Sequence, residues 1–228
     1  MSSREAILAR VRAANERVQH ARSTRLHPTL RPQDQVPDPG APWEYGRPTP
    51  LPDVLTRFAE RVADYRAAVV EVTHEGVPSA IADALAAAGV TSVVVPDGLP
   101  RDWVDGFGAR VDLVTDDPPL SHAALDATGA VVTTAAAGIA ETGTIVLDHG
   151  PGQGRRALTL VPDVHICVVR ADQVVSDVPE AVLRLVEPLG AGRPLTWISG
   201  PSATSDIELS RVEGVHGPRT LHLIIARG

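Results

Sequence analysis

Three polar, glycine-containing segments interrupt the apolar runs of this chain in ways that suit chemistry. The first spans Gly138 to Leu147, where Glu141 lies between two apolar stretches and Gly143 permits close backbone approach. Glu141 could act as a base, as a carboxylate nucleophile, or as an acceptor that orients a ligand, with the hydroxyls of Thr142 and Thr144 beside it. The same residues also suit a hairpin turn, and both interpretations stay open.

The second segment, Ser199 to Glu208, directly follows an apolar strand. Ser205 and Glu208 have the spacing of a capping box, which predicts a helix beginning at Asp206. Three further small or hydroxylated residues would crowd the same helix N-terminus: Gly200, Ser202 and Thr204. Unpaired N–H groups and the helix dipole attract anions there, at the carboxyl end of a strand. We therefore expect an anion or carboxylate site.

The third segment, Gly214 to Arg219, precedes the last strand. An arginine can bind a carboxylate or phosphate through two parallel hydrogen bonds, and a histidine titrates near neutral pH. Arg219 and His216 are candidates for these two roles, and a tight turn at the glycines would not exclude them.

Other combinations are less specific. Ser202, Asp206 and His216 do not form a hydrolase triad, because Thr204 replaces the second glycine of a nucleophile elbow. A histidine–carboxylate metal site could combine four residues without diagnostic spacing: His165, His216, Asp206 and Glu208. The glycines between 148 and 156 lack the spacing of a dinucleotide fingerprint and predict a loop instead.

Alternating helices and strands must position these segments. The first half is predicted to hold a helix over 54–65, a strand over 67–72, a helix over 78–88, and strands over 91–95 and 112–115. The second half is predicted to hold strands over 130–134, 139–142, 144–147, 164–169, 195–199 and 221–226, with a helix over 179–189. The fold class is therefore α/β, a mainly parallel sheet flanked by helices with an added antiparallel portion.

Because parallel strands bring their ends to one edge of a sheet, we expect the candidate residues to line a single cleft. The members of this expected cleft are Glu141, Ser202, Thr204, His216 and Arg219.

The N-terminal region, residues 1–51, differs from the α/β domain expected over 52–228. Residues 1–25 carry 6 arginines and 2 glutamates on an amphipathic helical pattern. This pattern fits a transit peptide, but we favour an arm that packs on its own domain or on a neighbouring subunit of a homo-oligomer. A proline-rich connector follows, with eight prolines between Pro28 and Pro52.

Composition excludes several classes of function. The chain has 228 residues, a net charge of −7, 3% aromatic residues and no lysine, which argues against nucleic-acid binding, a Walker P-loop and Schiff-base chemistry. No apolar stretch is long enough to predict a membrane span. The single cysteine, Cys167, lies in an apolar strand, so we expect an inert core thiol, no iron–sulfur or zinc site in this chain, and a cytoplasmic location.

Four ordered motifs together resemble the LutC/YkgG family, the LUD-domain proteins linked to lactate utilisation. They are Ala140 to Thr144, Val161 to Ile166, Ser199 to Glu208, and Gly214 to Arg219. The resemblance is strong over about 128–226 and implies a NagB/RpiA/CoA-transferase-like fold. It also implies a role beside iron–sulfur partner proteins in oxidising L-lactate to pyruvate. Larger relatives carry cysteine clusters that this chain lacks, so any electron transfer would reside in the partners.

Two classes of function therefore compete. In the first, the chain is an accessory component that binds a small carboxylate or a phosphorylated ligand, and by itself is colourless and does not oxidise lactate. In the second, it is a free-standing acyl- or CoA-transferase-like enzyme with Glu141 as nucleophile, a reading that rests on fold analogy. The ligand-binding set expected in either case is Thr142, Gly143, Thr144, Gly200, Ser202, Thr204, Asp206 and Arg219, with Glu141 and His216 as catalytic candidates.

Overall fold

The structure is a computed structural model, and it describes residues 48–205, 211–213 and 217–228, with only the backbone described at 203–205 and 211–213. At its centre is a six-stranded parallel sheet. In spatial order its strands are β1 (Ala68–Thr73), β12 (Thr220–Arg227), β7 (Val164–Arg170), β4 (Ala130–Thr134), β2 (Ser92–Val95) and β3 (Asp112–Thr115). The expected mainly parallel α/β architecture is confirmed.

A second, mixed sheet packs near the first. Its strands are, in order, β8 (Val174–Val175), β5 (Ala137–Ile139), β6 (Thr144–Leu147) and β9 (Thr196–Ile198). β5 and β8 are parallel, whereas β6 runs antiparallel to both β5 and β9. This sheet is the added antiparallel portion.

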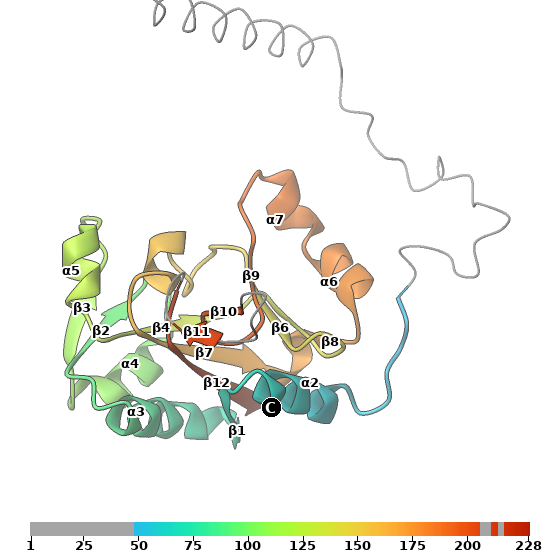
Figure 1. Cartoon of the computed structure of the whole chain (residues 1–228), viewed down its shortest axis with the longest axis horizontal. Coiled ribbons are helices and arrows are strands. Elements are labelled where there is room, and N and C mark those ends of the chain that lie inside the picture. Colours follow the sequence, from blue (N-terminus) through green and yellow to red (C-terminus); the bar gives the residue numbers. More distant parts are fainter. Residues whose placement is uncertain (1–47, 206–210, 214–216) are drawn as a thin grey trace, which may run out of the picture. The chain divides into compact units, whose positions relative to one another are not determined.

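Helices pack on both faces of the parallel sheet. The helices and short 3-10 helices (η) are α2 (Val54–Asp64), η1 (His74–Gly76), α3 (Val77–Ala87), α4 (Arg101–Gly108), α5 (His122–Asp126), η2 (Arg156–Thr159), η3 (Ala171–Gln173), α6 (Val178–Arg184) and α7 (Val186–Gly190). α3 and α4 pack on one face of the parallel sheet, through Ile81, Trp103 and Phe107. α2 packs on the other face through Phe58 and Val62, and α6 covers the mixed sheet. Figure 1 shows α6 beside strands β6 and β8 of the mixed sheet. Among the described residues, no helix has the length and apolar character that crossing a bilayer requires.

Cys167 lies in the core between the parallel sheet and α2, as expected. Its thiol is fully buried, and this burial raises its pKa to about 12. The residue is therefore a protonated, inert core thiol at physiological pH.

Two local predictions are wrong in detail. The strand expected over 139–142 is β5 at Ala137–Ile139, because Gly143, with φ of 61°, closes a turn after it. The helix expected over 179–189 divides into α6 and α7. Pro188 has no N–H to bond the carbonyl of Arg184, so the helical hydrogen bonding breaks there.

The segment after Ser202 begins with a strand. β10 (Ala203–Ser205) pairs antiparallel with β11 (Arg211–Glu213), with Thr204 opposite Val212. The expected helix start at Asp206 itself lies outside the described residues.

Candidate functional site

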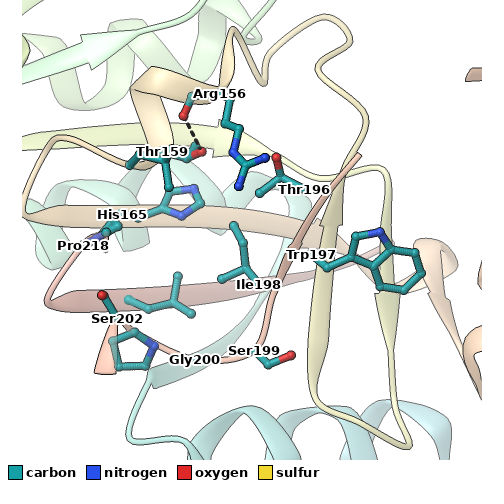
Figure 2. A pocket seen from close by; sticks show the side chains of 14 residues that line it. Arg156, Thr159, His165, Thr196, Trp197, Ile198, Ser199, Gly200, Ser202 and Pro218 are labelled. Atoms are coloured by element: carbon teal, nitrogen blue, oxygen red, sulfur yellow. Dashed lines mark hydrogen bonds between the residues drawn. The ribbon is translucent and has the colours of Figure 1, made fainter. Parts of the chain in front are cut away.

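A cavity of about 320 Å³ lies at the amino ends of β7 and β12, and we call it the amino-end cavity. His165 and Leu221, each the second residue of its strand, form one wall. The remaining walls come from η2, from β9 with the loop that follows it, and from the turn that precedes β12. Its polar side chains belong to Arg156, Thr159, His165, Thr196, Ser199 and Ser202 (Figure 2).

This cavity lies at the amino ends of the parallel strands, whereas the site was expected at their carboxyl ends. The loop Ser199–Ser202 follows β9, which belongs to the mixed sheet. The carboxyl-end rule applies to parallel strands and does not govern a loop that leaves an antiparallel edge strand. As a result, the loop meets the parallel sheet at its amino end.

Arg156 supplies the cavity's positive charge. Its exposed side chain makes no hydrogen bond or ion pair with any residue that the structure describes. The neighbouring Arg155 points elsewhere and binds Asp116 through two hydrogen bonds of 2.7 and 2.9 Å. No acidic residue is among the described residues that line the cavity, so an anion would meet a guanidinium without a competing carboxylate.

The hydroxyl groups in the cavity wall are held in defined orientations. His149 Nδ1 lies 2.8 Å from the carbonyl of Gly154, which can only accept, so this nitrogen carries the imidazole proton. His149 Nε2 therefore accepts a hydrogen bond from Thr196 Oγ1 at 2.8 Å. Thr159 Oγ1 likewise donates to the carbonyl of Arg156 at 3.3 Å. Both threonine oxygens are left with lone pairs as acceptors.

His165 lies at the floor of the cavity and is only 1% exposed. Its Nε2 is 2.8 Å from Thr133 Oγ1, and Nδ1 has no hydrogen bond to a described residue. Burial lowers the pKa of His165 to about 4. The imidazole is therefore neutral at physiological pH and can accept a hydrogen bond or a proton.

Tyr65, which directly follows α2, and Arg61 within it pack closely against the loop at Gly200 and the turn at Gly143. Gly200 has φ of 85°, and a Cβ there would lie 2.4 Å from Cβ of Tyr65, so only glycine fits. A Cβ at Gly143 would similarly lie 2.7 Å from the carbonyl carbon of Arg61. The residue types at these two positions are explained by close packing against α2.

The structure brings some of the predicted site residues together. Gly200 and Ser202 line the cavity. Thr144 Oγ1 lies 2.8 Å from Ser199 Oγ and 2.7 Å from Thr142 Oγ1, so the two threonines connect to the cavity through Ser199.

Other predicted residues lie elsewhere. Glu141 is exposed in the turn between β5 and β6, where its N–H donates to the carbonyl of Ser176 at 3.0 Å. Arg219 is exposed and pairs with Asp163, with Nε to Oδ1 at 2.8 Å, a contact that raises the pKa of Arg219. Neither residue is among those that line the cavity. Thr204 is described only as backbone in β10, while Asp206 and His216 lie outside the described residues.

Sequence reasoning missed Arg156, Thr159 and Thr196. No spacing marks them, because η2 and β9 are brought together only by tertiary packing. His165 was considered solely as a metal ligand. Its detectable signal was a single ionisable residue within the apolar strand of residues 164–169.

Within the described part of the chain, no group of three His, Cys, Asp or Glu residues is arranged to hold a metal ion. Because Asp206, Glu208 and His216 are outside that part, the histidine–carboxylate set stays an untested hypothesis.

A second hollow, of about 690 Å³, lies where β2 and β3 end, and we call it the carboxyl-end hollow. Its walls contain three aspartates: Asp97, Asp116 and Asp117. Asp116 is paired with Arg155, and this contact lowers its pKa. The two hollows therefore differ in the sign of the charge they present.

The sequence profile of the LUD domain matches residues 55–226, which is most of the chain. The chain belongs to the LUD-domain family. This confirms the resemblance to LutC/YkgG proteins seen in the four motifs.

Individual relatives of this LUD-domain protein extend over most of its length. A Deinococcus radiodurans protein named Lactate utilization protein C is 52% identical over 79% of this chain and 84% of its own. A Geobacillus thermodenitrificans protein of the same name is 28% identical over 90% of both chains. The crystal structure of a DUF162 family protein from Deinococcus radiodurans is similar with a TM-score of 0.68 and 46% identity, covering 78% of this chain and 100% of that one.

Proposed function

We propose that this protein is an accessory component of lactate utilisation that binds a small carboxylate in the amino-end cavity. In this role it works with iron–sulfur partner proteins in the cytoplasm, and those partners carry the electrons from L-lactate. The relatives named Lactate utilization protein C support the pathway. The observation that carries the binding role is Arg156, whose guanidinium lies among hydroxyl groups and has neither an ion-pair partner nor a lining carboxylate among the residues that the structure describes.

Arg156 is assigned the carboxylate-binding role that sequence analysis gave to Arg219. The guanidinium of Arg219 is already engaged by Asp163 at the surface, and its side chain is 61% exposed. A carboxylate ligand there would compete with both water and Asp163. Arg156 offers its donors to a cavity instead.

The transferase alternative requires Glu141 to face a bound acyl group. Glu141 is exposed at a hairpin turn and does not line the amino-end cavity, so nothing in the described residues favours this alternative. A glutamyl thioester trapped on Glu141 after incubation with an acyl-CoA would favour the transferase over the accessory role.

Thermal unfolding of the full-length protein with L-lactate, with pyruvate and without ligand tests the binding role. A ligand present at about 100 times its Kd stabilises the folded state by about 2.7 kcal/mol, which raises the Tm by roughly 5–10 °C for a chain of this size. Arg156→Ala should abolish the shift. Arg219→Ala should keep it, as should the control Arg110→Ala, which removes an exposed arginine that lines neither hollow.

If neither carboxylate shifts the Tm of the wild-type protein, the binding role is wrong. If Arg219→Ala, and not Arg156→Ala, abolishes the shift, the ligand binds where sequence analysis placed it. The partner role is tested separately by purifying the tagged protein from its native source, where we expect iron–sulfur proteins to co-purify. The purified protein by itself should be colourless, and it should not reduce a redox dye when lactate is added as the electron donor.

A further inference from the structure

A buried chain of hydrogen-bonding groups lies beneath the floor of the amino-end cavity. Thr133, His165 and Cys167 are each no more than 1% exposed and belong to the adjacent strands β4 and β7. Thr133 Oγ1 lies 2.8 Å from His165 Nε2 and donates to Cys167 Sγ at 3.6 Å. The Cys167 thiol in turn donates to the carbonyl of Thr134 at 3.8 Å.

The direction of this chain determines which imidazole nitrogen carries the proton. The Thr133 hydroxyl has a single proton, and two acceptors lie within its reach, His165 Nε2 and Cys167 Sγ. When this proton points to Cys167, the Thr133 oxygen accepts a hydrogen bond from His165, so Nε2 carries the imidazole proton and Nδ1 has a free lone pair. When it points to His165, the two imidazole nitrogens exchange these roles. Cys167 does not compete as an anion, because burial keeps its thiol protonated.

The lone pair on Nδ1 belongs to a wall of the amino-end cavity. His165 is among the residues that line the cavity, and its Nδ1 bonds no described residue. Thr159 and Thr196 add two more acceptors to the same walls, since each donates its proton elsewhere. Figure 2 shows these three side chains with Arg156 around one end of the cavity.

We propose that His165 is a specificity-determining residue, whose Nδ1 accepts a hydrogen bond from the hydroxyl group of a hydroxycarboxylate held by Arg156. The corresponding oxocarboxylate presents a carbonyl oxygen, which cannot donate and would face the lone pairs of His165, Thr159 and Thr196. The cavity therefore selects the alcohol over the ketone. This inference rests on the proposed function, because it requires a carboxylate in the amino-end cavity.

Isothermal titration of the full-length protein with L-lactate and pyruvate tests the selection. We expect lactate to bind at least about tenfold more tightly, since leaving a buried acceptor unpaired lowers affinity by about this factor or more. His165→Gln can place an amide N–H at the position of Nε2 for Thr133 and leaves no acceptor at the position of Nδ1, so the preference should fall to roughly twofold or less while pyruvate still binds.

Thr133→Val is a second variant that does not touch the ligand. It removes the acceptor that fixes the proton on Nε2, so Nδ1 can become the donor and the preference should fall or reverse towards pyruvate. Cys167→Ser is the matched control within the same buried chain. A serine hydroxyl can accept from Thr133 and donate to the carbonyl of Thr134, and the lactate preference should remain.

Equal binding of lactate and pyruvate that is lost in Arg156→Ala would overturn the role of His165 and leave the proposed function intact. Tighter binding of pyruvate by the wild-type protein would show that Nδ1 is a donor, and this result would also overturn the role of His165. If neither compound binds, both the proposed function and this inference fail.

Discussion

The amino-end cavity and the carboxyl-end hollow share the segment 154–160 as a wall but present opposite chemistry. Gly154 and Leu158 face the carboxyl-end hollow, while Arg156 and Thr159 face the amino-end cavity. The larger hollow is acidic, and its nearby arginine, Arg155, is already neutralised by Asp116. The smaller cavity has an arginine that pairs with none of the described residues, and oriented hydroxyls. Charge and pairing, rather than volume, therefore distinguish the site for an anion.

The comparison also separates two adjacent arginines that look equivalent in sequence. Arg155 stabilises the fold by joining η2 to the loop after β3. Arg156 makes no such contact with the described residues and is available to a ligand. Four experiments can test the difference between the amino-end cavity and the carboxyl-end hollow.

The largest effect is expected from Gly200→Ala. The new methyl group would collide with Tyr65 at a backbone position of positive φ, so we expect a loss of roughly 3–4 kcal/mol in unfolding free energy. The loop would move from α2, and the carboxylate-induced Tm shift should disappear. Chemical denaturation measures the first effect and thermal unfolding the second. Gly190→Ala is the control, because nothing lies within 4 Å of its added Cβ. A stable Gly200→Ala protein with normal binding would contradict this account of the cavity wall.

A pH dependence of stability should originate at the cavity floor. The pKa of His165 is lowered to about 4 in the folded state, against about 6.5 in the unfolded chain. The unfolded state therefore binds more protons between these values, and stability falls as the pH drops from about 6.5 to about 4. The contribution is roughly 2–3 kcal/mol over the window.

His165→Gln should flatten this part of the stability curve, measured by urea denaturation at several pH values. His222, whose pKa is also lowered by burial, remains in both proteins and cancels in the comparison. Identical pH profiles for the two proteins would mean that His165 is not buried as described.

Asp116→Asn should lower the free energy of unfolding without changing ligand binding in the amino-end cavity. The substitution removes a charge-assisted pair with Arg155, and we expect a loss of about 1–2 kcal/mol at neutral pH. Because the pairing lowers the pKa of Asp116, its contribution is present above the ordinary pKa of an aspartate and is lost as the pH falls through the lowered value. The difference between variant and wild type should therefore shrink in acid. The carboxylate-induced Tm shift should be unchanged. Its loss would show that the ligand binds in the carboxyl-end hollow and not in the amino-end cavity.

The smallest effect is expected when the folded protein is treated with a reagent that alkylates Cys167. Burial raises the pKa of its thiol to about 12, so iodoacetamide at pH 8 should not label the folded protein but should label it in guanidinium chloride. Mass spectrometry gives the extent of labelling. Rapid modification of the folded protein would show that the cavity floor is open to solvent.

Sequence by itself determined the alternation of helices and strands, the burial of Cys167 and the family. Apolar periodicity depends on local backbone geometry, so β3 and β4 have the predicted bounds, and α2 and α3 agree with prediction within a residue or two. The close backbone approach predicted at Gly143 is present, and Gly200 shares its positive φ, while a ligand-binding role of either glycine stays a prediction.

Only the tertiary structure decided which polar residues meet. Residues 203–205 pair with residues 211–213 as antiparallel strands, a pairing that local sequence patterns did not predict. Arg155 and Arg156 are alike in sequence, but one turns to Asp116 and the other to a cavity built from η2, β7, β9 and β12. β9 and β12 lie tens of residues beyond η2 and β7 along the chain. Their contact depends on how the mixed sheet packs against the parallel one, an arrangement determined by long-range core packing that no local pattern encodes.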